Sequence, residues 1–182
     1  MSSEATKMKQ RERAVSPFSN EARNTYVVEH ITDALLELMR DCPMQQLSVS
    51  EICDKAGVGR VSFYRNFGSK EEILRRYDRR IVRATFESQK PDDRSFDATA
   101  FVQALLHHYK LYQDFYTLLY RDGLSHIVLD TINSFIGPQK EDESIVALSK
   151  AFLSYGLYGI VDEWVARGMK EPESVVAALM KQ

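Results

Sequence analysis

The side chains best suited to specific hydrogen bonding in this chain cluster between residues 60 and 70. Arg60, Ser62 and Arg65 offer guanidinium and hydroxyl groups. Phe63 and Phe67 lie four residues apart, a spacing that places both on one side of a short helix and anchors it inward. The three polar residues then project from the other side as a basic face. Such groups suit contacts with phosphates and base edges, not the making and breaking of covalent bonds.

Two flanking elements must position this helix. Ser48 and Glu51 have the spacing of a capping box, which predicts a helix start at Ser48. That helix has an apolar face made by Val49, Ile52, Cys53 and Ala56. Gly57 is expected to end it in a left-handed conformation, and Ser69 to cap the next helix. Two short helices across a glycine turn, the second basic outside, form a helix-turn-helix, the motif that places a helix in the major groove of DNA.

The segment GVGRVSFYRNFGSKEEIL closely resembles the DNA-binding signature of the TetR family of bacterial transcriptional regulators. The matching residues are Ala56-Gly57-Val58, Ser62-Phe63-Tyr64, Phe67 and Ser69-Lys70-Glu71, and the resemblance covers about residues 22–84. It implies three phosphate contacts, from Ser48, Tyr64 and the helix start at Lys70. Gly59, Arg60 and Ser62 lie where the family contacts base edges, and Arg65 adds to the basic face.

Two positions leave alternatives open. Val61 stands where the family often has a small residue, and it either contacts a thymine methyl group or packs inside the protein. Tyr64 is either a phosphate ligand or a core aromatic.

The distribution of charge agrees with one DNA-facing end. Residues 1–90 carry 16 Lys and Arg against 13 Asp and Glu, whereas residues 91–182 carry 8 against 13. The segment from Lys55 to Lys90 alone carries 10 against 4. A basic segment in a chain of net charge −2 is typical of a nucleic-acid-binding surface.

Composition excludes several other classes of protein. The two cysteines, Cys42 and Cys53, favour a reducing cytoplasm over a disulfide framework. The polar first twenty residues do not form a signal peptide, and the short apolar runs predict no transmembrane helix. His107, His108 and His126 lack metal-ligand spacing, so no metal and no cofactor is expected. The Gly57–Ser62 segment imitates a dinucleotide-binding loop but follows a helix and lacks the third glycine, and no serine-hydrolase elbow occurs; an enzyme is therefore not expected.

The pattern along the chain predicts an all-α protein of two parts. Residues 1–20 form a flexible basic arm, residues 21–88 the DNA-binding domain, and residues 94–182 a helical domain for effector binding and dimerisation. The break is expected at Lys90-Pro91-Asp92-Asp93. Helices are expected over residues 21–40, 48–56, 60–67, 69–88, 96–112, 114–120, 124–136, 141–167 and 172–180.

The C-terminal part, from about Leu105, resembles a domain found in a subset of TetR-type regulators that includes activators of dihydroxyacetone kinase operons. The motif SYGLYGIVDEWVARGMKEPESVV carries this likeness. The same part is rich in aromatic residues, which either line a pocket for a small apolar or aromatic effector or form the core. The pocket hypothesis names Phe101, Tyr109, Tyr112, Phe115, Tyr116, Tyr120, Phe152 and Tyr155.

The stretch Ala151 to Val161 is apolar nearly all round and needs cover on two sides. A second copy of the chain is the expected cover, with an interface of Gly156, Gly159, Ile160, Val175 and Leu179. These inferences together predict a homodimeric, cytoplasmic repressor that binds a double-stranded operator under allosteric control. The alternatives are a regulator that is ligand-independent or controlled by a protein partner, and, from another class, a small helical enzyme or carrier with an aromatic pocket.

Overall fold

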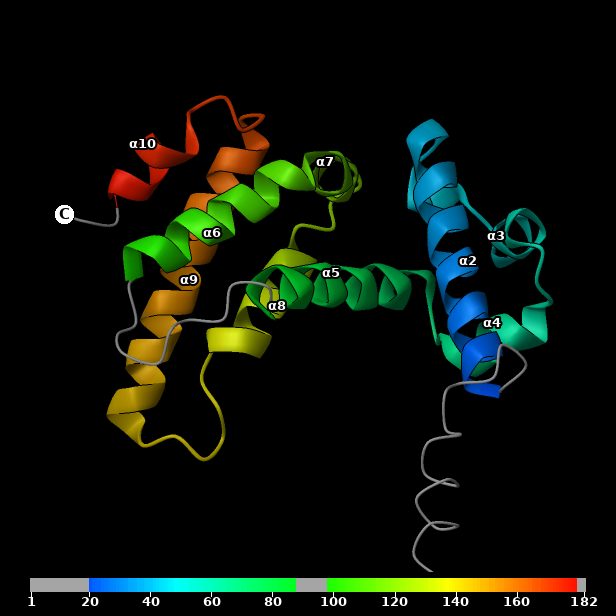
Figure 1. Cartoon of the computed structure of the whole chain (residues 1–182), viewed down its shortest axis with the longest axis horizontal. Coiled ribbons are helices and arrows are strands. Elements are labelled where there is room, and N and C mark those ends of the chain that lie inside the picture. Colours follow the sequence, from blue (N-terminus) through cyan, green and yellow to red (C-terminus); the bar gives the residue numbers. More distant parts are fainter. Residues whose placement is uncertain (1–19, 88–97, 180–182) are drawn as a thin grey trace, which may run out of the picture.

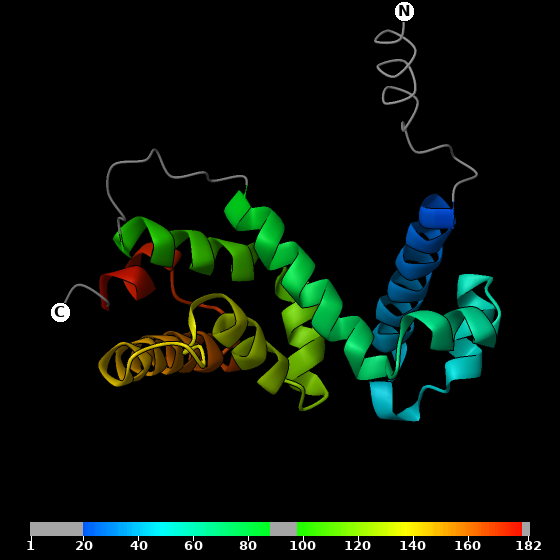
Figure 2. The same ribbon diagram turned by 90° about the horizontal axis from the view of Figure 1, so that it is seen from below.

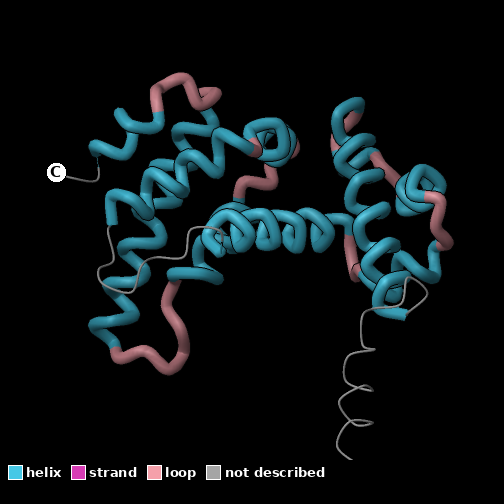
Figure 3. Tube along the Cα trace, in the orientation of Figure 1, coloured by secondary structure: helices cyan, strands magenta, loops and turns pink. Residues whose placement is uncertain are grey.

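The computed structural model describes residues 20–87 and 98–179, and within these ranges every regular element is a helix, as the sequence predicts (Figure 3). The elements in chain order are α2 (Asn20–Asp41), the 3-10 helix η1 (Met44–Gln46), α3 (Val49–Ala56), α4 (Arg60–Asn66), α5 (Lys70–Glu87), α6 (Ala98–Leu111), α7 (Gln113–Arg121), α8 (His126–Ile136), α9 (Ser144–Ala166) and α10 (Glu173–Ala178). Nearly all of the expected basic arm and the expected boundary at Lys90 to Asp93 lie outside the described residues.

Two groups of helices are joined by α5 (Figure 1). In one group α2 packs on α3 and α4, and in the other α6, α7 and α8 pack with α9 and α10. The linking helix contacts α2 in the first group and α6 and α8 in the second. The view from below shows α5 crossing obliquely from the first group to the second (Figure 2). Because α5 packs against both groups of helices, a movement of one group that displaces α5 would also move the other group.

The sequence pattern of α5 predicts its buried face only in part. The apolar residues Ile73, Leu74 and Ile81 are buried, and Tyr77 is half-buried. Ala84 falls on the same apolar stripe of the sequence but is exposed, whereas the charged residue Asp78, which a hydrophobic pattern leaves out, is 1% exposed. The inward face of α5 is therefore partly polar.

Helix α9 is apolar around its circumference, yet only one side of it is buried. The buried residues on that side are Ser154, Leu157, Val161, Trp164 and Val165. By length and composition alone α9 would also suit a membrane span, the one such helix among the described residues, but this does not overturn the expectation of no transmembrane helix. Ile145, Leu148 and Phe152 are instead 69%, 67% and 84% exposed. These three residues follow at helical spacing, so they form one continuous apolar face that nothing in the chain's described residues covers.

Candidate nucleic-acid interface

A complete capping box begins α3. The hydroxyl oxygen of Ser48 accepts the Glu51 N–H at 3.1 Å, and the Glu51 carboxylate accepts the Ser48 N–H at 2.7 Å. Hydrogen bonds from the Ser48 hydroxyl and from the Ser48 backbone N–H to the carboxylate lower the pKa of Glu51. Ser48 is exposed, so a phosphate could compete with this carboxylate for its hydroxyl hydrogen.

The turn between α3 and α4 has the geometry that the glycines predict. Gly57 lies at φ 66° and ψ 31°, in the left-handed region, where a β-carbon would be strained. Gly59 occupies the N-cap of α4 in an extended conformation. Its missing side chain leaves the start of α4 open, because a β-carbon placed there would have no neighbour within 4 Å. A DNA backbone or base could therefore approach closely.

Two buried phenylalanines hold α4 against the rest of the domain. Phe63 and Phe67 are 0% and 1% exposed, with ring centroids 6.0 Å apart. Arg60 and Arg65 are exposed on the same helix, as the basic-face hypothesis requires. Ser62 is half-buried, so of the predicted base-facing residues it has the least freedom to reach a partner.

The exposure of Val61 and Tyr64 argues against the alternative in which each packs in the core, and their contacts with DNA stay a prediction. Val61 is 74% exposed, so it does not pack inside the described protein. Tyr64 is 56% exposed, with its ring set edge-on against Phe63 at 5.3 Å between centroids. This contact orients the tyrosine ring while leaving its hydroxyl outside the core. Tyr64 is therefore not a core aromatic.

Lys70 has a structural role that its sequence position does not predict. Its Nζ donates hydrogen bonds to the carbonyl oxygens of Met44, at 2.7 Å, and Leu47, at 2.5 Å. The ammonium group thus fixes the start of α5 to the segment before α3. Two of the three ammonium hydrogens are thus engaged within the domain, which leaves the third and the backbone N–H groups of the helix start for a phosphate.

The helix-turn-helix segment matches a known family. Residues 31–77 match the family model described as bacterial regulatory proteins, tetR family. The chain carries a TetR-family DNA-binding domain. It is accordingly a DNA-binding transcription regulator and not an enzyme.

Two further comparisons do not bear on this assignment. Among solved structures, the chain is similar to the fatty acid degradation regulator FadR from Bacillus halodurans, with 19% identity over 83% of this chain and 90% of that chain, at a TM-score of 0.44. No curated protein matches the sequence. The finer likeness of the C-terminal part to the subset with dihydroxyacetone kinase operon activators is not confirmed by these comparisons and stays a prediction.

Arg121 and Asp122, at the end of α7, connect the TetR-type domain to the second helical group, and we call this pair of residues the clasp. Asp122 is buried, and its Oδ2 accepts the Met44 backbone N–H at 2.7 Å. The neighbouring Arg121 donates from Nη2 to the Met39 carbonyl at 2.5 Å and from Nε to Asp122 Oδ1 at 2.8 Å. Arg121 therefore caps the C-terminal end of α2, where a cation is favoured.

A second connection is a buried chain of hydrogen bonds inside the C-terminal group. The Tyr116 hydroxyl donates to Asp78 Oδ1 at 2.7 Å and lies 2.8 Å from His108 Nε2. Because Tyr116 has one hydrogen, which goes to the carboxylate, His108 must carry its proton on Nε2. Nδ1 lies 2.7 Å from the Thr85 hydroxyl oxygen, whose single hydrogen has a second acceptor in the Ile81 carbonyl, 3.0 Å away. The network ties α5 to α6 and α7.

Burial shapes the acid–base properties of this network. Asp78 Oδ2 has no hydrogen-bond partner within the described part of the chain. Desolvation raises the pKa of Asp78 to about 6 and lowers that of His108 to about 4. Both shifts favour the uncharged form, as expected for ionisable groups in an apolar interior.

The aromatic residues proposed for an effector pocket do not gather in one place. Tyr109, Phe115 and Tyr116 are buried in the core, whereas Phe152 and Tyr155 are 84% and 57% exposed. Phe101, Tyr112 and Tyr120 are half-buried at the edge of the core. The grouping of all eight residues is therefore corrected, because α9 turns Phe152 and Tyr155 away from the others. Among residues 20–87 and 98–179, no cluster of metal-ligating side chains occurs.

Proposed function

We propose that this TetR-type chain is a homodimeric repressor whose affinity for a double-stranded operator is controlled by the helices α6 to α10. The observation that carries this proposal is the surface of α4. Arg60, Val61 and Tyr64 are exposed side by side on a helix whose opposite side is fixed by buried Phe63 and Phe67. A helix held rigidly, with free polar and apolar side chains outward, is suited to the major groove.

Each exposed group has a chemical role in this proposal. Arg60 forms a bidentate pair with guanine, and Val61 contacts a thymine methyl group. Ser62 adds a shorter contact beside the open backbone at Gly59. Ser48 and Tyr64 donate their hydroxyl hydrogens to phosphates. Arg65 and the N–H groups at the Lys70 helix start add sequence-independent attraction.

Dimerisation through α9 and α10 is supported by the uncovered apolar face. Phe152 lies on α9, and Val175 and Leu179, at 55% and 59% exposure, lie on and just beyond α10. A β-carbon at Gly156 or Gly159 would meet no atom within 4 Å, so both glycines offer a flat surface for close approach of a second helix. Ile160, half-buried, borders the same region. A second copy would cover these residues and bring two recognition helices onto one face of DNA.

Control of DNA affinity is supported by the connections of α5 and α7. A change in the packing of α6 to α8 would act on α5 through Asp78, on α2 through Arg121 and on the 3-10 helix η1 through Asp122. A small apolar or aromatic effector inserted beside Tyr109 or Phe115 is one source of such a change. The second candidate is a ligand-independent or partner-controlled regulator, which is favoured by the packing of Tyr109 and Tyr116, 1% and 0% exposed, in the core.

The test is binding of the full-length protein to the DNA flanking its own gene, followed by fluorescence anisotropy. Saturable binding that survives competition by unrelated DNA would support the proposal. Binding with equal affinity to all sequences would contradict the base contacts assigned to Arg60. Melting curves in the presence of apolar and aromatic metabolites then separate the two candidates, because an effector raises the melting temperature by binding only the folded state.

A further inference from the structure

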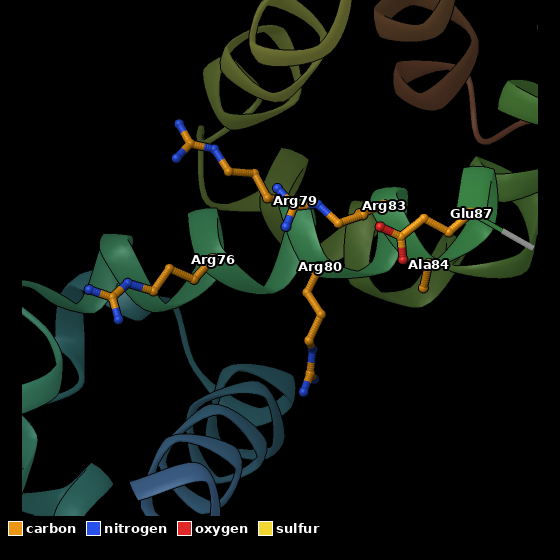
Figure 4. Close-up of a pocket in the computed structure, with 6 residues that line it drawn as sticks. All are labelled: Arg76, Arg79, Arg80, Arg83, Ala84 and Glu87. Atoms are coloured by element: carbon orange, nitrogen blue, oxygen red, sulfur yellow. The ribbon is translucent and has the colours of Figure 1, made fainter. Parts of the chain in front are cut away.

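A second basic surface lies on α5, away from the proposed recognition helix. It consists of Arg76, Arg79, Arg80 and Arg83, and we call it the α5 arginine surface. With Ala84 and Glu87 these residues line a hollow of about 330 Å³, near the lower end of the range for small-molecule sites, roughly 300–1,000 Å³. Figure 4 shows the four arginine side chains fanning out from the helix, with Arg80 directed toward α2.

The positive charge of this surface is only partly balanced. Arg76 pairs with Glu72, and Arg80 approaches Glu29 of α2 at 3.9 Å, the outer limit of an ion pair. Arg79 and Arg83 have no ion pair within residues 20–87 and 98–179.

Like charges on this helix also face one another. Arg79 and Arg83 lie four residues apart on the helix, as do Arg76 and Arg80, and like charges at this spacing repel each other. An anion bound among them would remove this repulsion.

The chemistry of the surface favours a phosphoryl group. Guanidinium groups bind phosphate oxygens through paired N–H donors, and they lose less hydration than ammonium groups when they do so. The hydrocarbon stems of the arginines and the exposed Ala84 methyl group provide an apolar floor beside these charges. A small molecule with a phosphoryl group and a short organic body fits both features.

The position of the surface distinguishes this ligand from operator phosphates. Arg83 lies thirteen residues after Lys70, or about 20 Å along the helix axis at 1.5 Å per residue. The arginines flank Asp78, which is buried among α5, α6 and α7. The surface therefore belongs to the part of α5 that joins the two helical groups, beyond the part that adjoins α4.

We propose that the α5 arginine surface is a binding site for a small phosphorylated molecule, with Arg79 and Arg83 as its principal ligands. Arg80 couples ligand binding to the DNA-binding domain, because a bound phosphoryl group competes with Glu29 of α2 for the Arg80 guanidinium. That consequence, but not the binding itself, rests on the proposed function.

The experiment is calorimetric titration of the full-length protein, without DNA, with inorganic pyrophosphate at constant ionic strength set by chloride. We expect saturable binding in the wild type and an affinity at least about tenfold weaker in Arg79→Gln with Arg83→Gln, since two charge-assisted contacts are lost. The matched control is Arg167→Gln with Lys170→Gln, which removes two exposed cations at and just beyond the end of α9. It changes the net charge equally and should bind like the wild type. Circular dichroism confirms that each variant is folded.

Three results would overturn the proposal. The first is a wild-type titration indistinguishable from dilution. The second is an equal loss of affinity in Arg167→Gln with Lys170→Gln, which would mean that only net charge matters. The third is normal pyrophosphate binding by Arg79→Gln with Arg83→Gln; if this variant also lost affinity for DNA at every sequence, the surface would be a contact for nucleic acid instead. As the titration contains no DNA, its outcome is independent of whether operator binding is found.

Discussion

Oδ2 of Asp122 lies 2.7 Å from the backbone nitrogen of Met44, in a buried contact that joins residues 78 positions apart. Met44 belongs to the 3-10 helix between α2 and α3, and Asp122 follows α7. Gln45 strengthens the same junction by donating from Nε2 to the Asp122 carbonyl at 3.0 Å. The DNA-binding domain is thus held to the C-terminal helices by polar contacts with defined geometry as well as by α5.

Asp122→Ala should lower the free energy of unfolding by about 1–3 kcal/mol, because the buried Met44 N–H loses its acceptor. Asp122→Asn should cost less, since an amide oxygen can still accept that hydrogen. Asp114→Ala, which removes an exposed carboxylate from the same helix, is the control and should change little. Urea unfolding of the three variants measures the difference. Equal stabilities for Asp122→Ala and Asp114→Ala would show that the clasp does not hold the domains together.

The buried pair Asp78 and His108 predicts two opposite dependences of stability on pH. The pKa of Asp78 is raised to about 6 from its ordinary value of 3.8, so the native state binds more protons than the unfolded state between these values. Stability from this group therefore falls as pH rises through that range. The pKa of His108 is lowered to about 4 from 6.5, so here the unfolded state binds more protons and stability rises with pH. Each contribution amounts to about 3 kcal/mol, so they largely cancel in the wild type.

Single substitutions should separate the two contributions. Asp78→Asn leaves the histidine, and its stability should rise between pH 4 and pH 6; His108→Gln leaves the carboxyl, and its stability should fall over the same range. Both replacements keep a polar group for Tyr116. Denaturant unfolding at several pH values gives the slope of the free energy of unfolding against pH for each variant. In the double variant this free energy should be nearly independent of pH, as in the wild type. Parallel slopes in the two single variants would contradict the assignment of these shifts.

Local sequence signals were sufficient to predict the helix-turn-helix. Ser48 with Glu51, Gly57, and the pair Phe63 and Phe67 each act through contacts a few residues apart, so the capping box, the left-handed turn and the inward anchor could all be predicted. The position of Lys70 was predicted in the same way, as the start of a helix. Its hydrogen bonds to Met44 and Leu47 span more than twenty residues and have no local signature.

The arrangement of the C-terminal part depends on such distant contacts. Asp78 could not be predicted as buried, because the hydroxyl groups that make its burial tolerable belong to distant residues, Tyr116, 38 residues away, and Thr131 of α8. In α9 the apolar residues surround the helix, and the pattern alone does not say which side meets the core. Phe152 was grouped with Tyr109 because this part of the chain is rich in aromatic residues, but Phe152 is exposed and Tyr109 is buried.

Two substitutions on α4 should weaken DNA binding in different ways. Tyr64→Phe removes one hydroxyl that donates to a phosphate, so it should reduce affinity for every sequence alike. Arg60→Ala should relax preference at one position per half-site and cost roughly 1–3 kcal/mol on the preferred base. Anisotropy titrations on an operator and on its single-base variants measure both effects.

The dependence on salt provides a further check of the same interface. Log affinity should fall with log salt concentration by a slope of about −0.9 for each phosphate neutralised. Arg65→Gln should make this slope shallower by about one, whereas Val61→Ala should leave it unchanged. Unaltered DNA binding in folded Tyr64→Phe and Arg60→Ala proteins would show that α4 is not the recognition helix.

The uncovered face of α9 leads to the last prediction, which concerns self-association. Gly156→Leu with Gly159→Leu places two bulky side chains where the structure leaves open space. In a monomer these leucines would meet no neighbour and should be tolerated; against a second copy they would prevent close approach of the helices. We therefore expect the double variant to stay folded, to dissociate at concentrations where the wild type is dimeric, and to lose operator affinity because two half-sites are no longer bound together. Lys140→Leu, on the exposed loop before α9, adds similar apolar surface elsewhere and is the control. Sedimentation at micromolar concentration measures the association, and a wild type that sediments as a monomer of 20.9 kDa would rule out the dimer.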